Sequence, residues 1–255
     1  MGTNTARIEM VTSVTSPDDF LTAAFEAPCR SLVLPCDLDA LADELGAPDA
    51  PDFVWTKIAG IDDPAFGPLT SMGFRIAVEE ITYERPGDAA ASAPSNGHDF
   101  TVHKLTPTST AQASAIADEV GGLAARNMTT SRFHQDPLVP DDIAAEIKKR
   151  WAMNFFIGGR GEEMYVASAA DDRVVGFNQV LVRPDCKVID LICTADDHRR
   201  RGVARAIVAA MFEPGIKTRV GSQANNEAAD EFYKSLDFEP VGRALCLHWH
   251  KGARI

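Results

Sequence analysis

The sequence predicts an α/β (α+β) protein in two parts: a C-terminal domain with a mixed central sheet flanked by helices, and a smaller α/β domain before it. Strand patterns alternate with helical patterns along the chain. Residues 87–98, rich in Ala, Ser, Pro and Gly, have linker composition, although an ordered loop is the alternative. The chain has 255 residues, 45% of them hydrophobic, so each part can bury a core. We therefore place the domains at 1–86 and 99–255.

The part before the linker alternates short apolar segments with helical patterns. Strands are predicted at 30–35, 53–58 and 74–84, and helices at 37–45 and 62–72. Asp37 is placed to cap the first helix and Gly46 to end it. The order predicts a small α/β unit that ends in a long strand.

The part after the linker has a distinctive order of elements. Strands are predicted at 100–104, 164–169, 174–182, 188–193 and 217–220 and as a final pair within 238–250, and helices at 109–126, 141–155, 200–212 and 226–236. Two helices thus precede three consecutive strands. Asp171-Asp172 and Pro184-Asp185 are turn sequences that join those strands.

Charge is distributed unevenly along the chain. The net charge of −12 argues against duplex nucleic acid as a partner, because phosphate backbones need a basic surface. Residues 1–98 carry 16 acidic and 5 basic side chains, whereas residues 99–255 carry 21 and 20. The nearly neutral C-terminal part can therefore hold local basic sites for small anions.

Other features predict a cytoplasmic protein. A membrane span is not expected, because the chain lacks a run of about 18 apolar residues. Residues 1–15 are polar and have no apolar segment of the secretory kind. The cysteines are odd in number and scattered, so free thiols in a reducing compartment are predicted. They are Cys29, Cys36, Cys186, Cys193 and Cys246.

The strongest local signal is at 190–207, where a buried strand enters a loop that opens a helix. The N-terminus of a helix offers unpaired backbone N–H groups, and small residues let a pyrophosphate approach them. The small residues are Gly202 and Ala204, and the surrounding cations are Arg199, Arg200, Arg201 and Arg205. The alternative is a basic helix cap on a solvated surface.

This segment resembles motif A of the GCN5-related N-acetyltransferase (GNAT) superfamily, (Q/R)-x-x-G-x-(G/A), with Arg199, Gly202 and Ala204 in its fixed places. The resemblance implies acetyl-CoA as co-substrate and direct transfer without a metal or an acyl-enzyme. It implies that Ile192, Cys193 and Thr194 bind the pantetheine arm, and that the backbone of Arg200, Arg201, Gly202, Val203, Ala204 and Arg205 binds the pyrophosphate. Cys193, without a paired base, is interpreted as structural.

Residues 223–238 resemble motif B of the same superfamily, N-x-x-A-x-x-x-Y-x-x-x-G-F. The matches are Asn226, Ala229, Tyr233 and Phe238, and Asp237 replaces the usual glycine. The resemblance implies that Asn226 holds the CoA arm and that Tyr233 reaches the thioester sulfur. A phenol stays protonated at neutral pH and can donate to a departing thiolate. The alternative is a core tyrosine beside Phe232.

The acceptor side is predicted from the segment between the first two helices of the C-terminal part. Ser131-Arg-Phe-His with Trp151 and Asn154 resembles the bacterial dTDP-fucosamine acetyltransferases, which acetylate an amino sugar on a nucleotide diphosphate. Arg132 is suited to pair with a phosphate. His134 and Asp136 can bond sugar hydroxyls or the amine, and Trp151 can pack on a base or sugar. Each residue also has a structural alternative, as helix cap, turn or core.

The group that removes the amine proton is left open among three carboxylates. Glu79 and Glu80 lie on the long strand, where adjacent residues face opposite sides, so at most one faces a cleft. Asp190 lies on the strand before the phosphate loop. A solvated strand face is the alternative.

Three functions remain open on the sequence. The first is N-acetylation of a nucleotide-linked amino sugar, dTDP- or UDP-4-amino-4,6-dideoxyhexose in type. The second is acetylation of another amine, such as an antibiotic, a polyamine or a protein N-terminus, which the acidic N-terminal part favours. The third is a non-catalytic CoA-binding module. Superfamily members often pair through sheet edges, so a homodimer is also an expectation.

Overall fold

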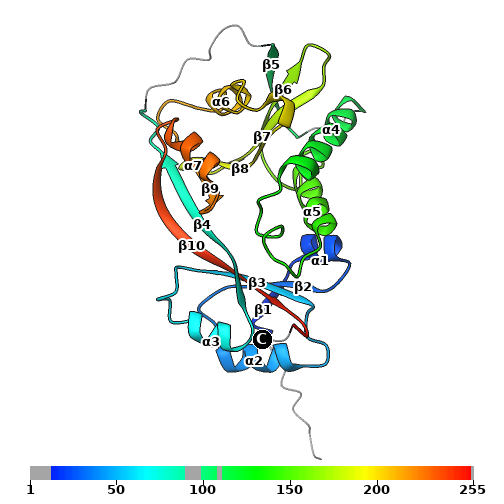
Figure 1. Ribbon diagram of the computed structural model, residues 1–255, viewed down its shortest axis with the longest axis vertical. Coiled ribbons are helices and arrows are strands. Elements are labelled where there is room, and N and C mark those ends of the chain that lie inside the picture. Colours follow the sequence, from blue (N-terminus) through cyan, green and yellow to red (C-terminus); the bar gives the residue numbers. More distant parts are fainter. Residues whose placement is uncertain (1–12, 90–98, 108–110, 254–255) are drawn as a thin grey trace, which may run out of the picture. The chain divides into compact units, whose positions relative to one another are not determined.

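The computed structural model describes residues 13–89, 99–107 and 111–253. The chain forms two compact units (Figure 1): unit 1 comprises Met1–Arg75 with Leu247–Ile255, and unit 2 comprises Ile76–Cys246. The chain passes between the units within β4 (Arg75–Arg85) and within β10 (Glu239–His250). This division differs from the boundary expected at 87–98, a segment that lies from residue 90 onward outside the described residues.

Unit 1 is a small α/β structure. Its elements are β1 (Thr15–Pro17), α1 (Asp19–Phe25), β2 (Cys29–Leu32), α2 (Leu38–Gly46), β3 (Phe53–Ile58) and α3 (Phe66–Ser71). The sheet order is β1-β2-β3-β10, with β1 and β2 antiparallel and β2 and β3 parallel. The Asp37 side chain accepts from the backbone N–H groups of Asp39 and Ala40, which confirms the predicted cap.

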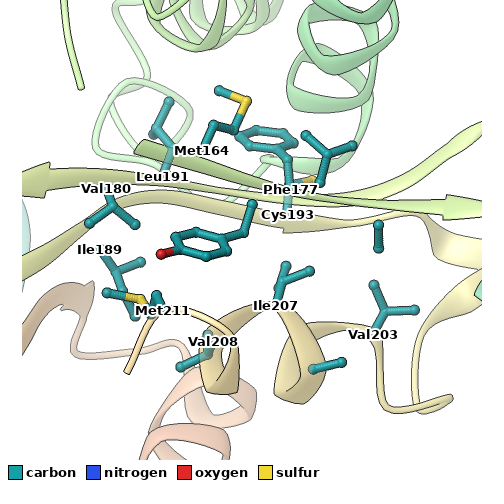
Figure 2. Packing of buried hydrophobic residues seen from close by; sticks show 14 of the residues in the cluster. Met164, Phe177, Val180, Ile189, Leu191, Cys193, Val203, Ile207, Val208 and Met211 are labelled. Carbon is teal, nitrogen blue, oxygen red and sulfur yellow. The ribbon is translucent and has the colours of Figure 1, made fainter. Parts of the chain in front are cut away.

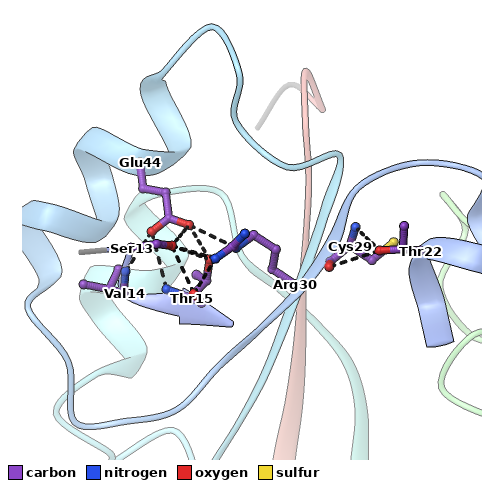
Figure 3. Close-up of polar contacts among 7 residues, drawn as sticks. All are labelled: Ser13, Val14, Thr15, Thr22, Cys29, Arg30 and Glu44. Atoms are coloured by element: carbon purple, nitrogen blue, oxygen red, sulfur yellow. Dashed lines mark hydrogen bonds and ion pairs between the residues drawn. The ribbon is translucent and has the colours of Figure 1, made fainter. Parts of the chain in front are cut away.

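A polar network links β1, β2 and α2 in unit 1 (Figure 3). The Glu44 carboxylate accepts hydrogen bonds from the Ser13 hydroxyl at 2.8 Å and the Val14 backbone N–H at 3.0 Å, and it also contacts Thr15 and Arg30. Partial burial raises the pKa of Glu44, but hydrogen bonds from Thr15 and Ser13 outweigh it and lower the pKa below its usual value. The network ties the short first strand to the second helix.

Unit 2 has the predicted mixed sheet flanked by helices. Its further elements are β5 (Phe100–Leu105), α4 (Ala111–Asn127), α5 (Asp141–Met153), β6 (Glu163–Ala169), β7 (Val174–Val182), β8 (Cys186–Thr194), the 3-10 turn η1 (Asp196–His198), α6 (Val203–Ala209), β9 (Lys217–Gln223) and α7 (Glu227–Lys234). The sheet order is β10-β4-β9-β8-β7-β6-β5. Strands β8 and β9 are parallel, whereas β9 is antiparallel to β4.

The helices of unit 2 cover both faces of its sheet. Helices α4 and α5 lie on one face, and α6 and α7 on the other (Figures 1 and 2). Figure 2 shows Met164 on the side of α4 and α5, while Ile207 and Val208 fill the side of α6. All three side chains are fully buried. No helix among the described residues has both the length and the apolar character that a membrane crossing requires.

Several elements of unit 2 differ from their predicted forms. The segment expected to hold a strand pair is one strand, β10, and the long strand before the linker, β4, lies in this sheet between β10 and β9. Strand β10 lies between β3 and β4 in the sheet. It continues through Gly242 without a turn. The helix predicted at 200–212 is shorter, as α6. Asp237 has a φ of 63°, as expected where it replaces glycine after α7.

Candidate functional site

Strands β8 and β9 pair for only part of their length. Their register runs from Cys186 opposite Lys217 to Ile189 opposite Val220 and ends there, although both strands continue. Beyond this point β8 pairs with β7 alone and β9 with β4 alone. One backbone edge of residues 190–194 therefore has no strand partner among the described residues, and buried backbone groups require hydrogen bonds from another source.

A β-bulge in β8 lies where the two strands separate. Gln179 pairs with Leu191 and Val180 pairs with Ile189, so Asp190 is the extra residue. The bulge reverses the alternation of side chains: Figure 2 shows Leu191 on the side of α4 and α5 but Ile189 on the side of α6. Asp190 is directed toward α5, where it contacts Trp151.

The loop after β8 adopts two left-handed backbone positions before the helix. Arg200 has a φ of 61° and Gly202, the N-cap of α6, a φ of 86°. Helix α6 then packs closely on β7, since a Cβ on Gly176 would lie 2.6 Å from the Val203 side chain. The predicted order of strand, loop and helix is therefore present, and Val203 is buried while Gly202 and Ala204 are partly exposed.

The arginines of this loop differ in whether they pair with another residue. Arg199 pairs with Asp196 at 2.9 Å and Arg201 with Asp99 at 2.5 Å. Arg205 donates to the Ser235 hydroxyl at 2.8 Å. Within the described part of the chain, exposed Arg200 has no hydrogen-bond or ion-pair partner. It is the arginine of this loop most available to an anion.

The strand residues expected to face the pantetheine arm lie at the separation of β8 and β9. Ile192 and Thr194 are partly exposed, whereas Cys193 is buried. The Cys193 thiol donates to the Leu123 carbonyl oxygen on α4 at 3.7 Å, and burial raises its pKa to about 12. A protonated, enclosed thiol is a poor nucleophile. This agrees with a structural role for Cys193.

Helix α7 carries the two predicted residues of the second motif. The Asn226 side-chain oxygen accepts from the Ala229 backbone N–H at 3.2 Å, so Asn226 is the N-cap of this helix. Tyr233 is only 3% exposed, with its ring 5.3 Å from Phe232 and 5.7 Å from Tyr83. Burial raises the pKa of Tyr233. Its hydroxyl has no hydrogen-bond partner among the described residues.

A second tyrosine lies beside Tyr233 and was not predicted. Tyr83 on β4 donates to Asp230 of α7 at 2.8 Å. Burial and this hydrogen bond raise the pKa of Tyr83 to about 12. Its position could not be inferred from sequence, because β4 was assigned to the N-terminal domain and not to this sheet.

The predicted acceptor segment lies between α4 and α5. Arg132 is buried, with Nη1 donating to Cys246 Sγ at 3.2 Å. His134 Nδ1 is 2.8 Å from the Ser131 hydroxyl, and burial, followed by the nearby Lys148, lowers the pKa of His134. Asp136 is buried and accepts from the Leu138 backbone N–H at 2.9 Å.

A reciprocal pair of amides connects this segment with the start of α7. Asn225 Nδ2 donates to Gln135 Oε1 at 2.9 Å, and Gln135 Nε2 donates back to Asn225 Oδ1 at 3.3 Å. Asn225 immediately precedes the N-cap residue Asn226. The structure thus brings together the predicted acceptor segment and the second motif.

Asp190 is the centre of a polar cluster. Its Oδ2 accepts from Trp151 Nε1 at 3.0 Å and from Gln179 Nε2 at 3.1 Å. Arg160 binds both carboxylate oxygens, at 2.6 and 2.7 Å. Asn154 ends α5, and its carbonyl accepts from the Arg160 backbone N–H at 3.3 Å. Sequence analysis selected three of these residues but missed Arg160 and Gln179.

Lys148 is the most unexpected residue near this cluster. It lies on α5, is 8% exposed, and places its ammonium 4.6 Å from the centroid of the Trp151 ring. Burial and the nearby Arg132 guanidinium lower the pKa of Lys148 to about 8, against the opposing attraction of Asp190 and Glu80. Ala144, Ile147 and Ala152 are buried on the same helix. That spacing could have shown Lys148 to be on the inner face.

The two glutamates of β4 have different surroundings. Glu79 forms an ion pair with Arg243 at 2.6 Å. The charge of Glu80 acts on Lys148 of α5.

A cavity of about 600 Å³ lies beside the loop, between α4, the turn 171–174 and the start of η1. Its lining includes Glu119, Asp171, Asp172, Asp196 and Asp197, but of the cations only Arg126 and Arg173. This excess of acids does not suit a pyrophosphate.

Comparison with known proteins identifies the core of unit 2. Residues 160–240 match a family model described as an acetyltransferase (GNAT) domain. The matched segment contains the separated strands β8 and β9, the loop of residues 195–202 (the arginine loop) and α7. Residues 160–240 are thus similar to a GNAT acetyltransferase domain. The predicted GNAT fold is therefore confirmed.

Two curated relatives match parts of the chain. The spore coat polysaccharide biosynthesis protein SpsD of Bacillus subtilis (strain 168) is 29% identical over 121 residues, which cover 46% of this chain and 41% of the relative. Mycothiol acetyltransferase of Rhodococcus erythropolis (strain PR4 / NBRC 100887) is 35% identical over 94 residues, 36% of this chain and 31% of the relative. The chain thus spans less than half the length of either relative.

A solved structure shares the fold over most of the chain. It is a tandem GNAT protein from the clavulanic acid biosynthesis pathway, with a TM-score of 0.62 and 15% identity. The match covers 90% of this chain and 77% of that one. At this identity the likeness concerns the GNAT fold alone.

Proposed function

We propose that this protein transfers an acetyl group from acetyl-CoA to the primary amine of a nucleotide-linked amino sugar, dTDP- or UDP-4-amino-4,6-dideoxyhexose in type. The observation that carries the proposal is the separation of β8 from β9 within the GNAT domain. It leaves an unpaired backbone edge that leads from the acceptor cluster to the arginine loop.

Acetyl-CoA fits this edge chemically. Its pantetheine amides can pair with the unpaired backbone of Ile192, Cys193 and Thr194. Its pyrophosphate suits the backbone of residues 200–205, with Arg200 as counter-charge. The carboxamide nitrogen of Asn226 stays available to the CoA arm, because the cap uses the oxygen.

The residues of the site divide the work of amide formation. Acetyl-CoA supplies the thioester that the amine attacks. Tyr233, whose pKa burial raises, stays protonated and donates a hydrogen bond to the departing sulfur. The base stays open among the three carboxylates. Glu79 is paired with Arg243, and the oxygens of Asp190 accept hydrogen bonds from three side chains.

The acceptor class rests on Arg132 and Lys148, two buried cations whose charges act on one another. Arg132 is assigned to a phosphate, and His134, Asp136 and Asn154 to sugar groups. Lys148 and Arg160 both lie over the Trp151 ring. The ring therefore contacts two cations in addition to any sugar that binds there. The name of the first relative, which refers to polysaccharide biosynthesis, favours a sugar acceptor.

A second candidate is acetylation of a different small amine. The match to a mycothiol acetyltransferase favours it, as does the acidity of residues 1–98. In either case we place the protein in the cytoplasm, in accord with its five free cysteines. Homodimerisation through a sheet edge remains a prediction, for which β5 is the edge strand of unit 2.

Release of CoA thiol from acetyl-CoA tests the proposal, with dTDP- and UDP-linked amino sugars as separate acceptors and polyamines and aminoglycosides as a second set. A reaction without acceptor corrects for the protein's own thiols. We expect release that depends on a nucleotide sugar. Release with the cationic amines alone would establish the second candidate. Acetyl-CoA binding without turnover on any amine would establish a non-catalytic CoA-binding module.

A further inference from the structure

Lys148 is a buried cation without a counter-ion in the part of the chain that the structure describes. Among the described residues its ammonium has neither a hydrogen bond nor a carboxylate within ion-pair distance, and only the Trp151 ring lies against it. A buried charge without a partner is costly, and proteins normally pair or neutralise it. Binding of an anion next to the Lys148 ammonium on α5 is therefore favourable.

The other charges near Lys148 make anion binding still more favourable. The guanidinium groups of Arg132 and Arg160 both act on Lys148 as like charges. Asp190 and Glu80 attract it, but Asp190 already binds Arg160 through both oxygens. Two guanidinium groups therefore oppose two carboxylates at Lys148, and one of these carboxylates is already bound to Arg160.

The sequence neighbour of Lys148 shows what an ordinary lysine does on this helix. Lys149 is partly exposed and pairs with Glu146 at 4.0 Å. Lys148 instead lies on the inner face with Ala144, Ile147 and Ala152, among residues that the proposed function assigns to the acceptor. The unpaired cation is therefore located where the acceptor is expected to bind.

We propose that Lys148, together with Arg132, binds a phosphate group of the acceptor and so restricts the site to phosphate-bearing amines. A diphosphate carries enough negative charge to neutralise two cations, whereas a single carboxylate carries one negative charge. The inference rests on the proposed function, because it names the group by which that same acceptor is recognised. It adds Lys148 as a specificity-determining residue that the sequence motifs did not include.

Binding of dTDP, UDP and inorganic pyrophosphate, measured by calorimetry with CoA at saturation, tests the proposal. Saturating CoA occupies the arginine loop and leaves the acceptor site as the phosphate site under test. Lys148→Met should weaken binding of all three probes by about 10- to 100-fold, the value of a charged hydrogen bond. The matched control, Lys149→Met, should bind them as the unmodified protein does.

A second variant guards against a folding defect. Lys148→Gln removes the charge but keeps a polar tip, and it should show the same loss. Both variants should melt at or above the temperature of the unmodified protein, because each removes an unpaired buried charge. Unchanged affinity in either folded variant, or no binding of any probe to the unmodified protein, would overturn the proposal.

The outcome is separable from that of the proposed function. If Lys148→Met loses phosphate binding but no nucleotide sugar is acetylated, the phosphate site stands and the sugar acceptor falls. If nucleotide sugars are acetylated and Lys148→Met leaves their KM unchanged, the acceptor stands and the role of Lys148 falls. Binding of dTDP and UDP but not of pyrophosphate would assign recognition to the nucleoside and would also refute the phosphate site.

Discussion

Asp190 has the chemistry of a general base, but its contacts in the folded protein favour a different role. As a bare carboxylate beside the phosphate loop, it is a natural candidate for the proton acceptor. In the folded protein its oxygens accept from Trp151, Arg160 and Gln179, and its side chain is 6% exposed. An anion bound by three donors has little accepting capacity left for an amine. We therefore regard Asp190 as a positioning residue that orients Trp151 and Arg160.

Asp190→Asn separates the two roles. If Asp190 only positions its neighbours, the variant should raise the KM of the acceptor, leave the KM of acetyl-CoA unchanged, and lose about 1–3 kcal/mol of stability, because an amide cannot accept all these bonds. Steady-state kinetics and thermal melting measure these changes. A fall in kcat of about 100-fold or more with unchanged KM would instead restore Asp190 as the base.

Tyr233→Phe tests the proposed proton donor. Its hydroxyl has no partner among the described residues, so the ring packing and the melting temperature should be nearly unchanged. We expect kcat to fall by about 10²–10⁴ while CoA binding is retained. Tyr83→Phe is the matched control: it loses the hydrogen bond to Asp230 and should cost stability more than kcat. Near-normal turnover by Tyr233→Phe would leave this residue a core tyrosine.

At the scale of elements, the loop between β8 and α6 combines backbone strain with ligand access. Gly202 has a φ of 86°, where a β-branched residue is strained whatever it contacts. Gly215, with a φ of 80° and open space around its Cβ position, offers the same strain away from the loop. Both valine variants should lose stability, but only Gly202→Val should lose CoA affinity, as measured by calorimetry. Equal CoA affinities would contradict the phosphate-loop assignment.

The contact of α2 with β1 should make unit 1 sensitive to acid. The pKa of Glu44 is lowered in the folded state, so its contribution is fully present above the unfolded value and is lost as the pH falls through the folded value. Hydrogen exchange of amides in β1 and β2 at pH 7 and pH 4 should show this loss. Glu44→Gln should exchange faster at pH 7 and depend less on pH. Exposed Asp43→Asn is the control and should resemble the unmodified protein.

At the scale of the whole molecule, local sequence patterns predicted most elements correctly. The strands at 53–58 and 174–182 agree to the residue, because a high content of β-branched and aromatic residues is a local property. Strand β1 and helix α1 were missed, since three and seven residues give too little periodicity. The place of β4 within the sheet was also missed, because strand pairing is a long-range property.

The same distinction applies to the candidate site. Motifs with fixed spacing identified the arginine loop and α7, and both lie within the segment that matches the GNAT family model. Lys148, Arg160 and Gln179 belong to no motif. Arg160 and Gln179 contact Asp190 at the bulge in β8. The bulge itself has no sequence signal, so these two residues could be found only in the folded chain. Lys148 contacts Trp151 on the same helix, and the spacing of α5 could have placed it on the inner face.

The division of the chain has a consequence for the order in which the protein can assemble on the ribosome. Unit 2 needs β4, which is synthesised early, to pair with β9, which is synthesised more than a hundred residues later. Unit 1 needs Leu247–Ile255, which are synthesised later still. Neither unit is therefore complete until these later segments have been made. Until then the edges of β3 and β4 lack their partner strands. Exposed strand edges of this kind are prone to aggregate, and chaperones can protect them.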